Sequence, residues 1–285
     1  MFVMLLAAAA TAGADPPDNY AKPDLLVSAD TLAKPEERKK FTPVDMRGEV
    51  AYRDGHIPKS VNAKTGLWSR AVNEGKATPE FWTKEFCALG LHPGMKVVLV
   101  YEDVKEGCRV WWLMKLAGVP DVRLLDGGWK AYVAAKAEVD KEEFTNPGPP
   151  MEWKADPDRL ATKDTVLSNV KDKVAQVVDA RSEKEFSGET AMSKRGGHVP
   201  GAERLEWSDF LDEKTKTFKP AGELKKLIAL HKLDLDKPCV TYCQSGGRSA
   251  VVAFGLELMG AKAVKNYYKS WSEWGNDPDV PVEKK

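Results

Sequence analysis

The chain has 285 residues, and its 43 lysine and arginine residues balance 43 aspartate and glutamate residues, so its formal net charge is zero. This length is ample for two domains of ordinary size, and the balanced charge argues against a surface that binds nucleic acid or another polyanion. Four cysteines without paired short spacing argue against a disulfide framework and against a zinc site. We expect no metal role for the four histidines either.

The N-terminus begins with an apolar stretch, Phe2 to Ala10, that is too short to span a bilayer. The Ala-Gly-Ala sequence that ends at Ala14 resembles a signal-peptidase site, so residues 1–14 are predicted to be a signal peptide and the protein to be periplasmic or secreted. Neither lysine nor arginine precedes the apolar stretch, which leaves open a truncated start or a plain apolar tail on a cytoplasmic protein. No other segment approaches transmembrane length, so the mature form is expected to have no membrane partner.

A first domain is predicted over residues 24–144, because short β-branched runs alternate there with helical patterns. Val97 to Tyr101 is a buried-strand pattern, and Arg109 to Leu116 is a helical one. The helical stretch carries the pair Trp111-Trp112, which we expect to pack in the core. This alternation is typical of an α/β fold with a mostly parallel sheet flanked by helices.

Residues 145–150, Thr-Asn-Pro-Gly-Pro-Pro, are the clearest linker, since their prolines forbid helix and favour an extended spacer. A second domain is predicted over residues 151–285, with a strand at Ala175 to Val178 and a helix at Glu223 to His231. In parallel sheets covered by helices, ligands bind in loops at the carboxyl ends of the strands. The functional residues are therefore expected in such a loop.

One such loop begins at Cys243, which ends a strand pattern and precedes an apolar helix pattern from Val251 to Met259. The backbone N–H groups of the loop and the positive end of the helix favour the thiolate over the thiol, so Cys243 is the expected nucleophile. The same N–H groups can hold an anion, and Arg248 closes the loop with a fixed charge. The other loop residues assigned to this site are Gln244, Ser245, Gly246, Gly247 and Ser249.

The spacing between the cysteine and Arg248 distinguishes two kinds of enzyme. Cysteine-dependent phosphatases separate the two residues by five positions, which makes room for a tetrahedral phosphate on sulfur. Here only Gln244 to Gly247 lie between them, and the shorter loop suits a terminal sulfur better. A phosphatase or an arsenate reductase is therefore the less favoured alternative.

At this loop the chain resembles the rhodanese family of sulfurtransferases, whose active loop has six residues from the persulfide-forming cysteine, as Cys243 to Arg248 does. The Val-Asp-Ala-Arg segment that ends at Arg181 and the Gly-His-Val-Pro-Gly-Ala turn that ends at Ala202 resemble further signatures of the family. Val264 to Trp274 resembles its last strand and closing tryptophan segment. Matching Val-Asp-Met-Arg and Gly-His-Ile-Pro segments in the first half imply two tandem rhodanese-like domains.

The two copies differ at the position of the nucleophile. We align Glu102 with Cys243, since His56 to Glu102 is 46 residues and His198 to Cys243 is 45. The loop after Glu102 is longer and acidic. A carboxylate there cannot accept sulfur and would repel an anionic donor, so the first domain is expected to be catalytically inactive.

The remaining cysteines are expected to pack rather than react. Cys239 lies on the strand before Cys243, and Cys87 lies in a helical pattern of the first domain. Cys108, beside Arg109, is interpreted as a packed residue, and a second thiol near the domain interface stays open as an alternative. The matching histidines, His56 and His198, are expected to make structural hydrogen bonds.

The resemblance implies a two-step transfer in which the Cys243 thiolate takes the sulfane sulfur of a small anionic donor and passes it to a thiophilic acceptor such as cyanide. Arg248 would attract the donor, and Arg181 and Arg195 are assigned to substrate binding with it. No metal or organic cofactor is needed. We expect the protein to act as a monomer.

The donor implied by the resemblance is thiosulfate or 3-mercaptopyruvate. Mercaptopyruvate enzymes carry an arginine about where this chain has Glu185, and a carboxylate there would disfavour a carboxylated donor. Thiosulfate is therefore the predicted donor, although Arg195 could replace the lost charge. A non-catalytic rhodanese module that binds or carries sulfur remains a further alternative.

Overall fold

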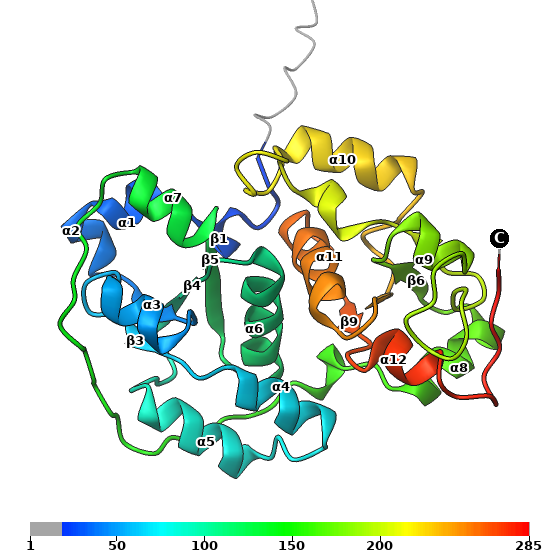
Figure 1. Cartoon of the computed structure of the whole chain (residues 1–285), viewed down its shortest axis with the longest axis horizontal. Coiled ribbons are helices and arrows are strands. Elements are labelled where there is room, and N and C mark those ends of the chain that lie inside the picture. The colour runs from blue at the N-terminus through cyan, green and yellow to red at the C-terminus, as the bar shows by residue number, and fades with distance from the viewer. Residues whose placement is uncertain (1–18, 285) are drawn as a thin grey trace, which may run out of the picture.

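The computed structural model describes residues 19–284, and within them two parallel sheets flanked by helices lie beside each other (Figure 1). The first sheet has the order β1-β5-β4-β2-β3, and all its pairings are parallel. Its central strand, β4, reads Lys-Val-Val-Leu-Val and is buried after the lysine, as expected for a strand covered on both faces. The strands are β1 (Leu26–Val27), β2 (Thr42–Asp45), β3 (Val61–Asn62), β4 (Lys96–Val100) and β5 (Asp121–Leu125).

Side-chain caps start three helices of this first domain, and the Ser28 side chain accepts the Thr31 N–H at the start of α1. The Thr78 side chain accepts the Phe81 N–H at the start of α5, and the Asp103 side chain accepts the Lys105 N–H at the start of α6. The helices are η1 (Pro23–Leu25), α1 (Ala29–Ala33), α2 (Pro35–Arg38), α3 (Glu49–Asp54), α4 (Gly66–Asn73), α5 (Pro79–Ala88), α6 (Val104–Leu116) and α7 (Gly128–Ala134).

The second sheet has the order β7-β6-β8-β9 and is also parallel, so the predicted α/β class with two tandem domains is confirmed. Its strands are β6 (Gln176–Asp179), β7 (Glu203–Arg204), β8 (Cys239–Tyr242) and β9 (Val264–Asn266). Its helices are η2 (Pro157–Arg159), α8 (Lys163–Asp172), α9 (Glu183–Ser187), η3 (Trp207–Phe210), α10 (Ala221–Leu230), α11 (Gly247–Leu258) and α12 (Ser270–Trp274).

The strand registers correct the alignment of the two copies by one residue. In each sheet the aspartate that ends one strand pairs with the last residue of its neighbour, and these pairs are Asp45 with Val100 and Asp179 with Tyr242. The residue that follows each neighbour, Tyr101 or Cys243, therefore occupies the same position, and Glu102 does not. The interval from His56 to Tyr101 is 45 residues, the same as from His198 to Cys243. The first-domain loop is also shorter, because α6 begins three residues after Tyr101 and α11 begins four residues after Cys243.

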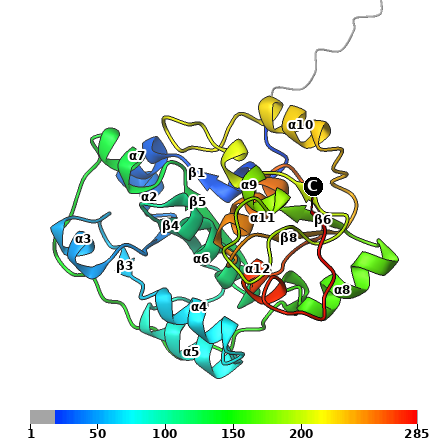
Figure 2. The same ribbon diagram turned by 45° about the vertical axis from the view of Figure 1, so that its right-hand side comes forward.

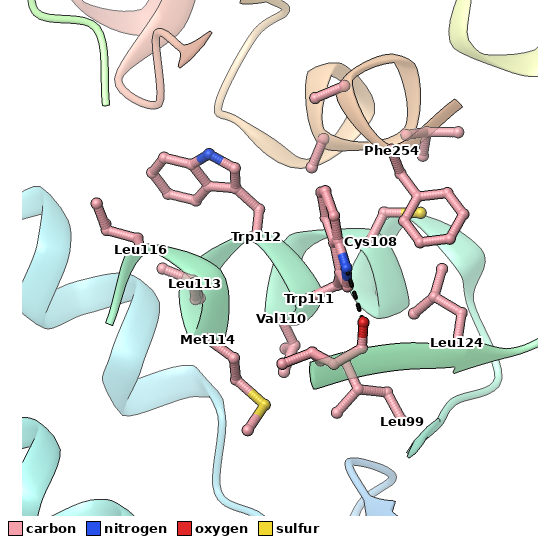
Figure 3. Close-up of a cluster of buried hydrophobic side chains, with 14 of the residues drawn as sticks. Leu99, Cys108, Val110, Trp111, Trp112, Leu113, Met114, Leu116, Leu124 and Phe254 are labelled. Atoms are coloured by element: carbon pink, nitrogen blue, oxygen red, sulfur yellow. Dashed lines mark hydrogen bonds between the residues drawn. The ribbon is translucent and has the colours of Figure 1, made fainter. Parts of the chain in front are cut away.

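The two domains meet where α6 packs along α11, which lie side by side in both views (Figures 1 and 2). The Trp111 ring meets Phe254 edge-on at 4.9 Å between centroids, and the Trp112 ring stacks on Tyr268 at 4.8 Å. Figure 3 shows Cys108 in this layer, surrounded by apolar side chains of both helices. Core packing of the tryptophan pair is confirmed, and it joins the two domains.

Two extended segments add to this contact. Residues 141–156 contain no helix or strand, and their Trp153 packs on Phe86 of the first domain. The predicted linker, 145–150, lies within this segment. At the other end of the chain, the Tyr20 hydroxyl donates to the Lys219 carbonyl at 2.8 Å, and the Lys22 N–H donates to the Leu258 carbonyl at 3.0 Å. The start of the described chain is therefore tied to the second domain (Figure 2).

The predicted signal peptide, residues 1–14, lies outside the described residues. Between residues 19 and 284, no helix combines the length and apolar character that a bilayer crossing requires.

Candidate active site

Cys243 directly follows β8 at the carboxyl edge of the second sheet. Only Gln244, Ser245 and Gly246 separate it from α11, so the thiol faces the positive end of a long helix, as predicted. Gly246 has a φ of 86°, and a side chain there would overlap the Tyr268 ring. The tight turn into the helix therefore requires glycine at this position.

The Cys243 thiol is only 1% exposed, yet its surroundings favour the charged form. Its Sγ accepts hydrogen bonds from the Gly246 N–H at 3.2 Å and from the Ser249 hydroxyl at 3.5 Å. Burial raises the pKa of Cys243, but hydrogen bonds from Ser249 and from the Ser245 N–H, together with the charge of Arg248, outweigh burial and lower this pKa below that of an ordinary thiol. The site therefore favours a reactive thiolate.

The segment from β9 to α12 holds the loop in place from behind. Ser270 Oγ accepts the Cys243 N–H at 3.1 Å. Asn266 donates to the Gly246 carbonyl at 3.1 Å and accepts from the Ser249 hydroxyl at 2.9 Å. These hydrogen bonds hold the N–H and O–H donors in position around Sγ before a substrate binds. Donors that are already oriented can stabilise negative charge on the sulfur without a reorganisation of the loop.

A depression of about 490 Å³ opens over the loop and lies between the two domains. Five of the predicted residues line it, and Gly246 and Ser249 act from beneath through their contacts with the sulfur. The predicted lining residues are Cys243, Gln244, Ser245, Gly247 and Arg248. The other lining residues were not predicted from the sequence, and they are Lys105, Glu106, Arg109, Met192 and Trp207. Their positions depend on how the two domains pack and on loops that carry no local sequence motif.

Arg248 is not the free cation that the sequence suggested. Its guanidinium makes a bidentate ion pair with Glu185, with nitrogen–oxygen distances of 2.6 and 2.8 Å. Glu185 is also held by the Ser182 hydroxyl at the start of α9. The expectation that Glu185 repels a carboxylated donor is therefore corrected, since its charge is neutralised by Arg248 and it does not line the depression.

The structure does not bring Arg181 and Arg195 to the depression. The buried Arg181 guanidinium binds the Asp179 carboxylate and the Gly197 carbonyl, and it lies 4.4 Å from the Trp271 ring. Arg195 donates to main-chain carbonyls near the C-terminus, including that of Val280 at 2.8 Å. Both side chains hold the second domain together, so this geometry argues against the assigned role in substrate binding.

The other cysteines lie in packed positions. Burial raises the pKa of Cys108 well above that of an ordinary thiol and the pKa of Cys239 to about 12, so neither is poised to react. Cys87 is half-buried on α5, and its thiol donates to the Gly148 carbonyl at 2.8 Å. The matching histidines, His56 and His198, each bond a main-chain carbonyl through Nδ1 at 2.8 Å, as predicted.

The family model of the rhodanese-like domain matches this chain twice, over residues 28–135 and residues 162–277. The chain belongs to the rhodanese family. The first matched range contains β2 to β5 of the first sheet, and the second contains the whole second sheet with the loop of Cys243.

This rhodanese-family chain is similar along most of its length to named sulfur-transfer proteins. It is 30% identical to the thiosulfate sulfurtransferase of Azotobacter vinelandii over 271 residues, which span 93% of this chain and 99% of that protein. It is 33% identical to the sulfur carrier protein TtuD of Thermus thermophilus over 285 residues, which span 93% of this chain and 98% of that protein.

Among solved structures, the anaerobic ergothioneine biosynthesis enzyme from Chlorobium limicola superposes with a TM-score of 0.80 over 94% of this chain and 72% of its own length. At 22% sequence identity this likeness shows the shared fold.

Proposed function

We propose that the protein is a thiosulfate sulfurtransferase in which Cys243 carries the sulfur as a persulfide. The proposal rests chiefly on one observation: a cysteine with a lowered pKa sits in a short loop of N–H donors that opens to a depression. Relatives named thiosulfate sulfurtransferase, in Azotobacter vinelandii and Pseudomonas aeruginosa, support the donor.

The proposed reaction has two displacement steps. The Cys243 thiolate attacks the outer sulfur of thiosulfate, a sulfur–sulfur bond forms to the enzyme, and sulfite leaves with the electron pair of the broken bond. Cyanide or another thiophilic acceptor then attacks the terminal sulfur and restores the thiolate. The Gly246 N–H and the Ser249 hydroxyl, which already bond Sγ, would stabilise negative charge on the sulfur during both steps.

A second donor, 3-mercaptopyruvate, stays the alternative, since a relative from Arabidopsis thaliana is named for both donors. With Arg248 paired to Glu185, the loop itself offers no unpaired guanidinium to a donor carboxylate. Relatives from Azotobacter vinelandii and Pseudomonas aeruginosa are named for thiosulfate alone, and on this support we expect a higher kcat/KM for thiosulfate than for 3-mercaptopyruvate. Steady-state rates with both donors at equal pH would decide between them.

A sulfur-carrier role is the second candidate function, favoured by the relative from Thermus thermophilus that bears this name. The chemistry at Cys243 would be the same, and only the acceptor would change from a small nucleophile to a protein thiol. Intact mass spectrometry tests both candidates: after thiosulfate treatment we expect a gain of one sulfur atom. Its release by cyanide with thiocyanate formation marks the transferase, whereas release to a protein thiol alone marks the carrier.

We further propose that residues 1–14 direct export and that the mature protein acts as a monomer. The apolar run and the Ala-Gly-Ala sequence support export. The N-terminal sequence of the protein purified from cells, together with its mass in solution by light scattering, tests both statements.

A further inference from the structure

Arg109 belongs to the first domain but contacts the sulfur loop of the second. It lies on α6, the helix that packs along α11 (Figure 1). A Cβ atom at Gly247 would lie 2.5 Å from Arg109 Nη2, so the guanidinium rests against the backbone of the loop. Arg109 also lines the depression over Cys243. A charged group of the catalytically inactive domain therefore sits at the mouth of the active site.

The hydrogen-bonding capacity of Arg109 is incompletely used. Its Nε is buried and has no hydrogen-bond partner within residues 19–284. The ion pair of its guanidinium joins Nη2 to Glu106 at 3.2 Å, and half of that carboxylate side chain is exposed. The Nε atoms of Arg159 and Arg195 also lack a hydrogen-bond partner within the described residues, so this feature alone does not distinguish Arg109. Arg109 differs from those two arginines in its position, because it lines the depression over Cys243 together with residues of the sulfur loop.

Two other cations, Arg248 and Lys105, line the same depression. Arg248 is held by both carboxylate oxygens of Glu185. Lys105 lies 3.2 Å from the Asp103 carboxylate, and its ammonium is 5.3 Å from the centre of the Trp207 ring. A doubly negative donor that enters this depression therefore meets in Arg109 a guanidinium whose ion-pair partner, Glu106, is half exposed to solvent.

We propose that Arg109 is a donor-binding residue, whose guanidinium holds the oxyanion end of an anionic sulfur donor while Cys243 attacks its outer sulfur. This inference rests on the proposed sulfur transfer and adds a substrate contact from the first domain. Arg248 is the cation that lowers the pKa of Cys243, so the two arginines have separate tasks. The active site is then complete only when both domains are present.

The test begins with wild-type protein, in which thiosulfate must add one sulfur atom to Cys243. Absence of this product overturns the proposed function and not the assignment of Arg109. In Arg109→Ala we expect the KM for thiosulfate to rise about tenfold with kcat nearly unchanged, because one charge-assisted contact to the donor is lost. Arg53→Ala, which removes the same charge from an exposed position on α3, is the matched control and keeps the wild-type KM.

Two further measurements separate donor binding from support of the interface. Glu106→Gln removes the competing carboxylate, so the KM for thiosulfate is expected to fall; a merely structural Arg109 predicts no fall. Sulfate is expected to protect Cys243 from iodoacetamide in the wild type and less in Arg109→Ala. An unchanged KM in Arg109→Ala, or equal protection by sulfate in both proteins, would overturn the proposal. If Arg109→Ala does not fold, Glu106→Gln decides the question.

Discussion

The two domains place different side chains directly after equivalent strands, Tyr101 after β4 in the first and Cys243 after β8 in the second. The backbone around them is alike, since the Trp129 N–H donates to the Tyr101 carbonyl as the Trp271 N–H does to that of Cys243. The Tyr101 ring occupies the space beyond the strand, where a Cβ atom at Gly107 would lie 2.6 Å from the ring. The position equivalent to Cys243 in the first domain is therefore occupied by an aromatic ring, and not by the carboxylate expected from the sequence.

A second pair of equivalent residues extends this comparison. Gly128 and Ser270 both have left-handed backbone, with φ values of 62° and 54°. Glycine adopts this conformation freely, but serine does so at a cost in free energy. At Ser270 the cost is offset by a function, because its Oγ accepts the Cys243 N–H and donates to the Tyr267 carbonyl. At this pair of positions the strained backbone therefore lies beside Cys243, and glycine relieves it in the first domain.

The largest effect is expected from the nucleophile itself. Cys243→Ser should abolish transfer from thiosulfate to cyanide while the thermal midpoint stays close to that of wild type, because a serine fits the same space but is not ionised. Thiocyanate formation measures this. Cys108→Ser is the comparison from the first domain, and it should keep full activity. Loss of activity in Cys108→Ser alone would reverse the assignment of the two domains.

The second largest loss of activity is expected from a substitution in the turn before α11. Gly246→Ala places a side chain against the Tyr268 ring at a positive φ, so we expect a displaced loop and a loss of about tenfold or more in kcat/KM. Gly201→Ala is the matched control, because Gly201 has a φ of 75° but no atom within 4 Å of an added Cβ. It should cost about 1–2 kcal/mol of stability and leave activity intact. Equal activities in the two variants would contradict the role given to the turn.

A half-buried carboxylate, Asp126, directly follows β5 and is expected to make stability depend on pH. Burial raises the pKa of Asp126 from 3.8 to about 6, so the folded state holds the proton more tightly and stability falls as the pH rises from about 4 to about 6. Asp126→Asn keeps an acceptor for the Phe218 N–H and should add up to about 3 kcal/mol of unfolding free energy at pH 7, with little gain at pH 4.

Urea denaturation at both pH values measures this gain. Asp30→Asn, at an exposed carboxylate, serves as the control and should change stability little at either pH. A gain of the same size at pH 4 and pH 7 in Asp126→Asn would exclude ionisation as its cause.

A smaller effect is expected from Ser249, whose hydroxyl and N–H help to lower the pKa of Cys243. Ser249→Ala removes the hydroxyl, so the pKa of the thiol should rise and alkylation by iodoacetamide at neutral pH should slow, with the full rate recovered at higher pH. The Ser272 hydroxyl bonds the Lys269 carbonyl and not the thiol, so Ser272→Ala should keep the wild-type pH profile. An unshifted pH profile of alkylation in Ser249→Ala would show that this hydroxyl does not lower the pKa of Cys243.

Much of this molecule follows from local patterns in the sequence. The strand before Cys243, its glycine-bearing turn and the apolar helix are local features, and the family motifs fix their order. The alignment of Tyr101 was missed by one residue, although the equal histidine intervals of 45 residues carry that signal. Counting intervals between fixed motifs would have found it.

Contacts between segments far apart in the chain could not be predicted from local sequence patterns. The pairing of Arg248 with Glu185 joins residues 63 positions apart, and the placement of Arg109 depends on how α6 packs on α11. Side-chain type alone does not say which arginines lie at the depression over Cys243. That depends on tertiary packing, which is why Arg181 and Arg195 were assigned to the substrate and Arg109 was not.

The most direct test of the central claim is to locate the transferred sulfur among the four cysteines. The protein is treated with thiosulfate, its persulfide is trapped by alkylation, and the peptides that contain Cys87, Cys108, Cys239 and Cys243 are analysed by mass spectrometry. The account predicts the extra sulfur on the Cys243 peptide alone and its loss after cyanide is added. Sulfur on Cys108, or no sulfur on Cys243, would contradict it.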